Sequence, residues 1–398
     1  MSMWAALSWG FWLAIVILAR VFRSVQYAIF RGITLGIHIL VVLALLPHLG
    51  IFRPLYLALH CLLFIDSALL IVPRLRPTWY RWFISLPSQY MGAATFMAFP
   101  WAIWSAFSFY PWGFQIPYVL GLIGLVQSLS ARSESRSIVV GDVEPVNQLS
   151  RHRYDVEAIP KAAQPLKIAQ ITDPHLGPFM PVARLKRICE RIVQSDPDLV
   201  LLTGDFLTME SQHDERFLSE GLSPLAALQG RVFACMGNHD HEAPKTVFSA
   251  MKQISATMLI DEATLVETRA GLVQILGLDF HFKQRRERIA SACARHPRIS
   301  NALRLVLLHD PGAFAHLPKG EADLVLSGHT HGGQVGLLSL GSSFTLAGFI
   351  AKIPDHGLWA HGQNRLYVHR GTGHYGFPLR LGVPAEESIV SVYKLSRS

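Results

Sequence analysis

Gly237-Asn238-His239-Asp240 and Gly328-His329-Thr330-His331 belong to a series of five short polar clusters that decides the fold of this chain. The other three are Asp173-Pro174-His175, Gly204-Asp205 and His309-Asp310. Each cluster lies at or just after the end of a short apolar run, and such runs, when turn residues flank them, are typical of buried strands. The runs are residues 166–171, 199–202, 232–235, 305–308 and 324–326. Polar side chains at the carboxyl ends of strands predict one shared crevice in an α/β fold.

The residue types in these clusters indicate metal binding. Carboxylates, an amide and imidazoles, without any cysteine, favour manganese, iron or zinc over a thiolate-bound structural zinc. Two ions that share one carboxylate fit the number of candidate ligands, and a pair of ions about 3.5–4 Å apart can clamp a phosphate and activate water. The candidate ligands are Asp173, His175, Asp205, Asn238, His309, His329 and His331.

Two residues are predicted to be catalytic, Asp205 and His239. Asp205 is the natural bridge because a carboxylate has two oxygens, whereas a neutral imidazole has one free lone pair. His239 follows Asn238 directly and is not needed as a ligand. We therefore expect it beside the site, where it would stabilise charge on a phosphate or protonate the leaving oxygen. Each cluster alone is more often a turn or a loop, so the prediction depends on all five occurring in this order.

The order D-x-H, G-D, G-N-H-D, H and G-H-x-H resembles the calcineurin-like metallophosphoesterase family over about residues 165–396. The resemblance implies a four-layer α/β/β/α sandwich with two divalent metal ions, manganese being preferred and iron or zinc the alternatives. The ligands it implies are Asp173, His175 and His331 for one metal, Asn238, His309 and His329 for the other, and Asp205 as the bridge. Pro174 departs from the usual first motif; it removes a backbone N–H but neither ligand.

The first third of the chain has a different composition. Residues 1–131 contain seven Arg, one Asp and neither Lys nor Glu. The hydrophobic fraction of 51% and the mean hydropathy of +0.30 are high for a soluble protein. Because about 20 apolar residues form a helix that crosses a bilayer, we predict a bundle of five transmembrane helices. They are expected at about residues 3–20, 32–50, 54–72, 88–109 and 114–131.

These patterns predict three parts of the chain. Residues 1–131 form the transmembrane domain, residues 132–164 a connector with an entry hairpin, and residues 165–398 the metallophosphoesterase domain. The strands of the hairpin are expected at residues 138–146 and 154–159.

Arginines flank the predicted spans unevenly. The positive-inside rule places the basic side of the spans in the cytoplasm. We therefore expect a multi-pass protein of the inner (cytoplasmic) membrane, with its catalytic domain on the cytoplasmic side. Arg53 alone lies on the opposite side, whereas the basic side has Arg20, Arg23, Arg31, Arg74, Arg76, Arg81, Arg132 and Arg136.

The charge distribution limits the partners. The formal net charge is +8, but residues 1–131 account for most of it, and the remainder has 29 basic and 27 acidic residues. A nucleic-acid-binding face needs a larger local excess, so no nucleic acid is expected, and no obligate protein partner is evident. The expected partners are the lipid bilayer and a phosphate-containing substrate.

The leading hypothesis is a membrane-bound hydrolase with two metals that cleaves a phosphoester or pyrophosphate bond. A soluble substrate gives little reason for five spans, so a lipid-linked or nucleotide-lipid substrate is favoured. The family that the chain resembles includes pyrophosphatases of UDP-2,3-diacylglucosamine. The alternatives are a general phosphodiesterase of soluble substrates and a non-catalytic membrane sensor. The sequence leaves open the role of Asp66, an acid in the middle of a predicted span, and of the apolar segment 337–353.

Overall fold

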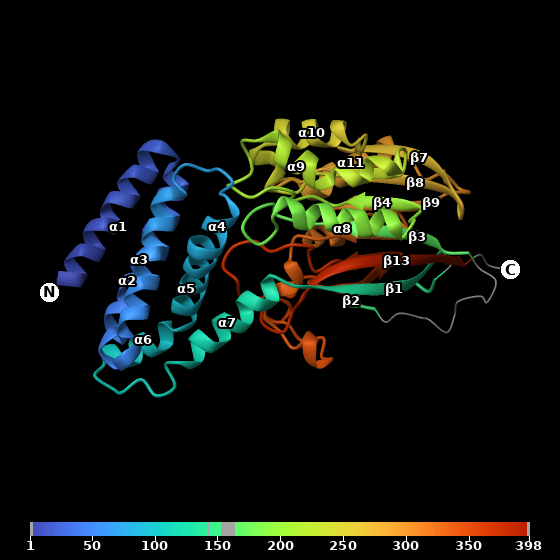
Figure 1. Ribbon diagram of the computed structural model, residues 1–398. Coiled ribbons are helices and arrows are strands. Elements are labelled where there is room, and N and C mark those ends of the chain that lie inside the picture. The colour runs from blue at the N-terminus through green and yellow to red at the C-terminus, as the bar shows by residue number, and fades with distance from the viewer. Residues whose placement is uncertain (1–2, 142, 153–163, 396–398) are drawn as a thin grey trace. The chain divides into compact units, whose positions relative to one another are not determined.

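The computed structural model describes residues 3–141, 143–152 and 164–395 (Figure 1). The chain divides into two compact units. The first, here called the helical unit, comprises Met1–Ser128 and Gly376–Leu381. The second, the sheet unit, comprises Leu129–Tyr375 and Gly382–Ser398.

Apolar helices make up the helical unit. Tyr56, Met91 and Phe114 belong to its buried core, whereas many other large apolar side chains face outward. The α-helices are α1 (Met3–Phe22), α2 (Val25–Leu45), α3 (Arg53–Leu69), α4 (Thr78–Tyr80), α5 (Leu86–Met97), α6 (Phe99–Ala106) and α7 (Ile116–Ser128).

Three helical segments among the described residues are long and apolar enough to cross a membrane, namely Met3–Phe22, Val25–His48 and Gly50–Leu69. The predicted span 88–109 is not one continuous helix, because α5 ends at Met97 and α6 begins at Phe99. Pro100 explains the break, since proline cannot donate the backbone hydrogen bond that would continue α5. The predicted span 114–131 is shorter than expected: α7 has 13 residues and ends at Ser128. The number of crossings stays a prediction.

Asp66 is buried in the helical unit with polar neighbours that the sequence did not reveal. One carboxylate oxygen accepts a hydrogen bond from the Tyr80 hydroxyl at 2.9 Å, and the other accepts one from the Ser88 hydroxyl at 2.9 Å. Ser85 and Gln89 donate longer bonds of 3.4 and 3.5 Å. Hydroxyl and amide groups therefore donate hydrogen bonds to this acid.

Two β-sheets form the sheet unit. The six-stranded sheet has, in spatial order, β1 (Ala131–Gly141), β13 (Ala385–Leu395), β3 (Leu166–Ile171), β4 (Leu199–Leu202), β5 (Val232–Ala234) and β6 (Thr257–Met258). The seven-stranded sheet has β2 (Val146–Arg151), β11 (Gly357–Gly362), β12 (Asn364–Val368), β10 (Leu324–Ser327), β9 (Leu303–Leu308), β8 (Gly271–Leu278) and β7 (Glu262–Thr268). The strands that precede the polar clusters lie next to parallel neighbours within each sheet.

The entry hairpin predicted within residues 132–164 stays a prediction, and the described strands of this region join different sheets. β1 pairs in parallel with β13 in one sheet, whereas β2 pairs with β11 in the other. Ile138 and Val140 explain this placement, because both side chains are buried in the core between the sheets. The second predicted hairpin strand, at residues 154–159, lies outside the described residues.

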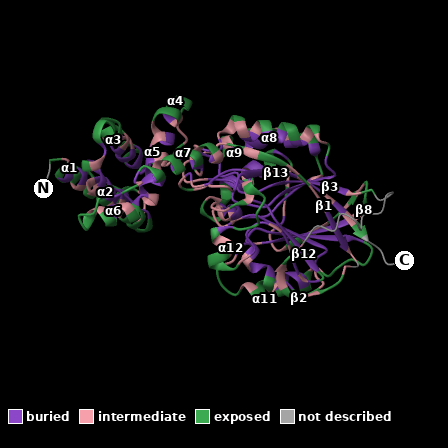
Figure 2. Ribbon diagram, turned by 90° about the horizontal axis from the view of Figure 1, so that it is seen from below, coloured by how far each residue is buried: buried purple, intermediate pink, exposed green. Residues whose placement is uncertain are grey.

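Helices cover the outer faces of the two sheets. A core of apolar side chains from both sheets fills the space between them, and a second core packs the seven-stranded sheet against α11. Figure 2 shows α8 and α9 on one side of the strands and α11 on the other. This is the four-layer α/β/β/α sandwich expected from the sequence. The helices are α8 (Val182–Gln194), α9 (Glu215–Leu222), α10 (Pro244–Gln253), α11 (Arg285–Arg295) and α12 (Leu346–Ala351).

Candidate metal centre

The polar clusters meet where strands of the two sheets end. β3, β4 and β5 are neighbours in the six-stranded sheet, and β9 and β10 are neighbours in the other. Ligand-type atoms gather there in two groups, within each of which the atoms lie less than 4.8 Å apart. One group consists of Asp173, His175 and His331, and the other of Asp205, His309 and His329.

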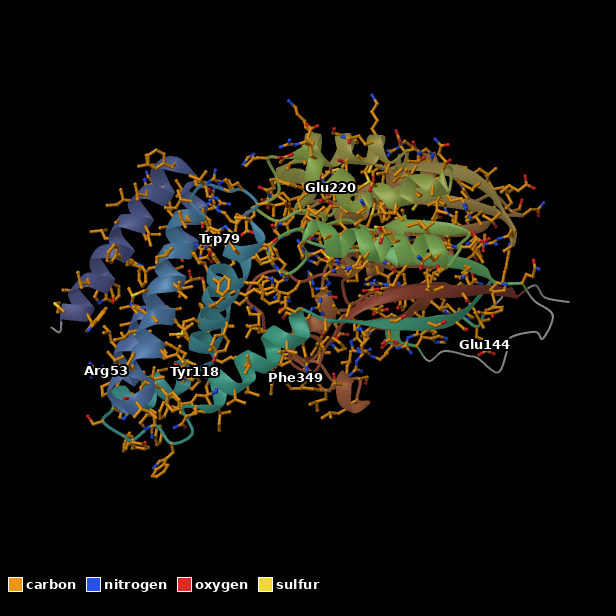
Figure 3. The ribbon with its side chains drawn as sticks, viewed as in Figure 1. Arg53, Trp79, Tyr118, Glu144, Glu220 and Phe349 are labelled. Carbon is orange, nitrogen blue, oxygen red and sulfur yellow. The ribbon has the colours of Figure 1, made fainter. Side chains whose placement is uncertain are left out.

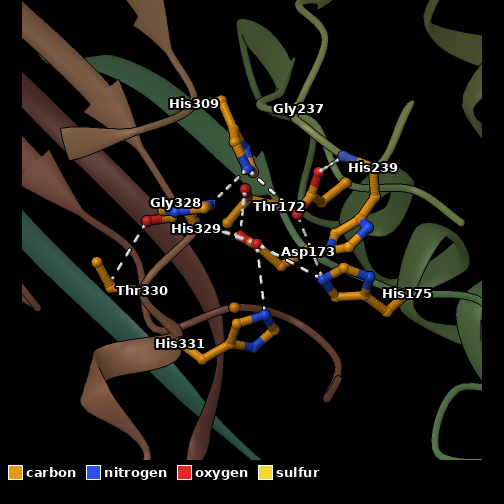
Figure 4. A network of polar contacts seen from close by, with 12 residues as sticks. Thr172, Asp173, His175, Gly237, His239, His309, Gly328, His329, Thr330 and His331 are labelled. Carbon is orange, nitrogen blue, oxygen red and sulfur yellow. Dashed lines mark hydrogen bonds and ion pairs between the residues drawn. The ribbon is translucent and has the colours of Figure 1, made fainter. Parts of the chain in front are cut away.

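Figure 4 shows Asp173 and the rings of His175, His309, His329 and His331 directed toward one another. Asp205 lies close to a histidine of each group. Its Oδ2 is 3.6 Å from Nε2 of His175 and 3.3 Å from Nε2 of His309. In the first group, Oδ1 of Asp173 is 3.8 Å from Nε2 of His175 and 3.5 Å from Nε2 of His331. These separations leave room for a cation between the atoms, and one carboxylate reaches both groups.

Hydrogen bonds on the far side of the rings hold two histidines in place. Nδ1 of His175 donates to the Leu207 carbonyl at 3.2 Å, and Nδ1 of His309 donates to the Thr203 carbonyl at 2.7 Å. Each bond leaves Nε2 as the free nitrogen that faces the cluster. This is the usual way in which proteins orient a metal-binding imidazole.

Asn238 provides a test of whether a metal fits. Its Oδ1 is buried and has no hydrogen-bond partner among the described residues. An unpaired buried carbonyl oxygen costs about 1–3 kcal/mol. In addition, Nδ1 of His329 lies 3.2 Å from Nε2 of His309, so two ring nitrogens face each other. The unpaired Oδ1 of Asn238 fits a bound cation, which would take the lone pair that the protein leaves without a donor.

The backbone at the centre is in an unusual conformation. Five candidate ligands have φ angles between 44° and 67°, the left-handed region that non-glycine residues rarely adopt. Such strain occurs at functional sites, where the surrounding structure holds it in place. Glycine is required beside them, because a Cβ on Gly237 would lie 2.2 Å from Oδ1 of Asp205. The five are Asp173, His175, Asp205, His329 and His331.

Burial and neighbouring charges shift the pKa values of side chains at the centre. Burial raises the pKa of Asp173 to about 6 and lowers the pKa of His175 to about 4. Burial by itself would lower the pKa of His309, but the charge and hydrogen bond of Asp205 raise it to about 10. The environment therefore favours positive charge beside Asp205.

His239 lies beside this centre and contacts it through its backbone. Its N–H donates to Oδ1 of Asp205 at 2.9 Å, and its Nδ1 is 2.8 Å from Oε1 of Glu242. Burial lowers the pKa of His239, but the bond with Glu242 and the charge of Asp205 outweigh it, so the pKa is higher than usual. The side chain is 21% exposed. This imidazole can hold a proton at the mouth of the site.

Sequence reasoning missed two neighbours of His239. Glu242 pairs with it across one turn, a spacing of three residues that the sequence does display. Tyr375 comes from the loop after β12, and its ring centroid lies 4.6 Å from that of His175 and 4.5 Å from that of His239. The glycines of residues 371–376 indicate a turn there, but Tyr375 itself was not predicted at the centre, because only the fold brings its ring to these histidines. The preceding residue, His374, is buried against Phe179.

Asp240 has a structural role in the third cluster. Its Oδ2 accepts hydrogen bonds from the backbone N–H groups of Asp205 at 2.7 Å and Gly237 at 2.8 Å, and its Oδ1 accepts one from Phe206 at 2.9 Å. The side chain thereby ties the loop that carries Asp205 to the loop that carries Asn238.

Comparisons with known proteins agree with this geometry. A family model described as calcineurin-like phosphoesterase matches residues 166–333. Phosphodiesterase YaeI of Escherichia coli is 31% identical over 62% of this chain and 88% of YaeI. UDP-2,3-diacylglucosamine pyrophosphatase LpxG of Chlamydia muridarum is 25% identical over 52% of this chain and 78% of LpxG. A Danio rerio transmembrane protein with a metallophosphoesterase domain is 28% identical over 58% of this chain and 54% of that protein.

An α/β sandwich with two groups of metal-ligand side chains defines a metal-dependent phosphoester hydrolase. The chain belongs to the calcineurin-like phosphoesterase family. Membership implies divalent metal ions, in agreement with the two ligand groups.

Proposed function

We propose that this chain is a membrane-bound hydrolase of a phosphoester or pyrophosphate bond in a lipid-linked or nucleotide-lipid substrate. The observation that carries the enzymatic part is the pair of ligand groups joined by Asp205, beside the unpaired Oδ1 of Asn238. One metal would be held by Asp173, His175 and His331, the other by Asn238, His309 and His329, with Asp205 shared. Manganese is the proposed metal, because carboxylate and amide oxygens suit it and imidazole is tolerated.

Bound ions would supply the positive charge that holds the phosphate and activates water. The residues of the chain then have separate tasks. Asp205 and Asp173 hold the two positive charges close together in a buried environment. His239 keeps a proton on its ring through Glu242 and delivers it to the leaving oxygen or stabilises charge on the phosphate. The ring of Tyr375 covers His175 and His239 on one side.

The lipid-linked substrate is proposed from the helical unit and from one relative. Three helical segments in the described part of the chain are long and apolar enough to cross a membrane, and anchoring raises the effective concentration of a membrane-borne substrate. LpxG is, by its name, a pyrophosphatase of a diacylated sugar nucleotide. YaeI is named a phosphodiesterase, which supports the rival proposal of a general diesterase.

We further propose the inner membrane and a cytoplasmic sheet unit, because Arg residues flank the helices on one side. Two reporters fused after Ser398 test this orientation. Green fluorescent protein, which fluoresces in the cytoplasm, is expected to be active. A phosphatase that works only in the periplasm is expected to be inactive. The reverse pattern would contradict this orientation.

A metal and substrate assay tests the function. Full-length protein in detergent is expected to contain close to two transition ions per chain, and added manganese is expected to restore activity after chelation. Bis-p-nitrophenyl phosphate and UDP-2,3-diacylglucosamine are the two substrates to compare. Faster turnover of the lipid substrate supports the proposal, and preference for the soluble diester favours the general diesterase. Two bound ions without turnover of either substrate would favour a sensor.

A further inference from the structure

One segment of the sheet unit exposes several large apolar side chains. The segment 337–353, here called the apolar loop, has no charged residue before Lys352. Phe349 is 70% exposed and Leu340 is 80% exposed, and Phe349 lies at the outer edge of the unit (Figure 3). Exposed apolar groups gathered in this way mark interaction sites. The large exposed side chains are Leu337, Leu340, Phe344, Leu346, Phe349 and Ile350.

Hydrogen bonds within the apolar loop give it a defined backbone structure. The Leu337 N–H donates to the Phe344 carbonyl at 2.9 Å, and the Leu346 N–H donates to the Val335 carbonyl at 2.8 Å. The Thr345 hydroxyl caps α12 by accepting from the Gly348 N–H at 3.0 Å. The backbone therefore meets much of its hydrogen-bonding need internally, which lowers the cost of entering an apolar medium.

Contacts within the sheet unit place this loop beside both points where the chain passes to the helical unit. Ser339 accepts a 3.5 Å hydrogen bond from Arg132, which is four residues beyond the end of α7 at Ser128. The Ser339 N–H also donates to the Gly382 carbonyl at 2.9 Å, and Gly382 directly follows the second segment of the helical unit. The apolar loop therefore lies beside the residues of the sheet unit that follow its two connections to the helical unit.

We propose that the apolar loop inserts into the membrane interface and binds lipid acyl chains. Apolar side chains occupy its exposed positions, no acid occurs in residues 337–351, and Arg132 and Lys352 can reach anionic headgroups. The inference rests on the proposed membrane-bound function. It adds to it a second membrane contact, one that belongs to the sheet unit.

This contact bears on the metal centre because the loop begins and ends beside it. The loop starts six residues after His331, and the Thr330 hydroxyl donates to the Asp355 carbonyl at 2.6 Å, just after the loop ends. The Thr345 hydroxyl also bonds the Asp355 carboxylate. A loop set in lipid would therefore hold the mouth of the site at the lipid surface, where a lipid-linked phosphate is available.

Insertion can be measured without any substrate. In a Cys61→Ser background, the other described cysteines are buried, so an environment-sensitive dye can be attached at Phe349→Cys. The full-length protein is reconstituted in vesicles whose lipids carry a quencher on the acyl chain. We expect a blue-shifted, strongly quenched dye at position 349. The matched control is Phe248→Cys on α10, which is 43% exposed and outside the loop, and its dye is expected to stay unquenched.

Two results would overturn the insertion. One is equal quenching at the two positions. The other is a disulfide-linked dimer through Phe349→Cys without lipid quenching, which would show that a second copy of the chain covers the loop.

Turnover gives an independent measurement. The double variant Phe349→Ser/Ile350→Ser is expected to lose most of its rate on UDP-2,3-diacylglucosamine in vesicles and to retain its rate on bis-p-nitrophenyl phosphate, as the Phe248→Ser control does on both. An unchanged rate on the lipid substrate would overturn the link to the site. If the unsubstituted protein hydrolyses only the soluble diester but the dye at position 349 is quenched, the proposed substrate fails and the insertion stands.

Discussion

Each unit of the molecule buries a cluster of polar side chains, and the two clusters are built in opposite ways. In the helical unit, His38 and His60 share a 2.9 Å hydrogen bond. Thr95 lies 3.1 Å from the other nitrogen of His38, and Ser8 lies 3.0 Å from the other nitrogen of His60. Asp66 accepts hydrogen bonds from hydroxyl and amide donors on neighbouring segments. These polar groups are therefore paired by hydrogen bonds within the helical unit.

In the metal centre, the polar groups do not all have hydrogen-bond partners. Asn238 leaves a buried oxygen unpaired, and several candidate ligands have a strained backbone. The comparison teaches that buried histidines and acids alone do not identify a site. An unpaired oxygen beside two groups of converging metal-ligand side chains is more specific, because a bound cation would pair with it.

The largest effect is expected from Asp205→Asn. The amide is neutral and cannot hold two cations, so hydrolysis should fall to the uncatalysed background and the metal content should fall below two ions per chain. Elemental analysis and turnover of bis-p-nitrophenyl phosphate measure both. Asp198→Asn is the matched control, because Asp198 lies just before β4 and Asp205 just after it. Full metal content together with normal turnover in Asp205→Asn would refute the shared carboxylate.

A smaller loss is expected from His239→Ala. Both ions should remain, because His239 is not among the proposed ligands, and kcat should fall by about 10²–10⁴-fold, as expected for loss of an acid catalyst. His241→Ala is the control, since its side chain is 40% exposed and pairs with Asp279. Loss of metal from the His239 variant would show that this imidazole is a ligand and would remove its proposed role.

The smallest effect on catalysis is expected from Asp66→Asn in the helical unit. The amide N–H₂ group would face the hydroxyl donors that now bind the carboxylate, so the free energy of unfolding should drop by about 1–3 kcal/mol. Thermal unfolding in detergent measures the loss. Folded protein should keep its metal content and its turnover of the soluble diester. Normal stability combined with a loss of that turnover would mean that the buried cluster of the helical unit is also functional.

In the helical unit, some features could be predicted from local sequence patterns and others could not. Composition alone indicated apolar helices, and among the residues that the structure describes three segments are long and apolar enough to cross a membrane. Pro100 was visible, but the division into α5 and α6 was not predicted. The donors to Asp66 could not be found by sequence, because Tyr80 and Ser88 reach it only after the helices pack.

In the sheet unit, the sequence determined the identity and order of the predicted ligands, since each follows a short apolar run that ends in turn residues. It also indicated the sandwich, through the family that these clusters resemble. Only the tertiary structure decided that the clusters come from two different sheets, that β1 and β2 join separate sheets, and that Glu242 and Tyr375 flank His239. Strand propensity and turn chemistry act over a few residues and leave local patterns. The pairing of distant strands and the approach of the loop after β12 depend on packing between segments far apart in the chain, which no local pattern records.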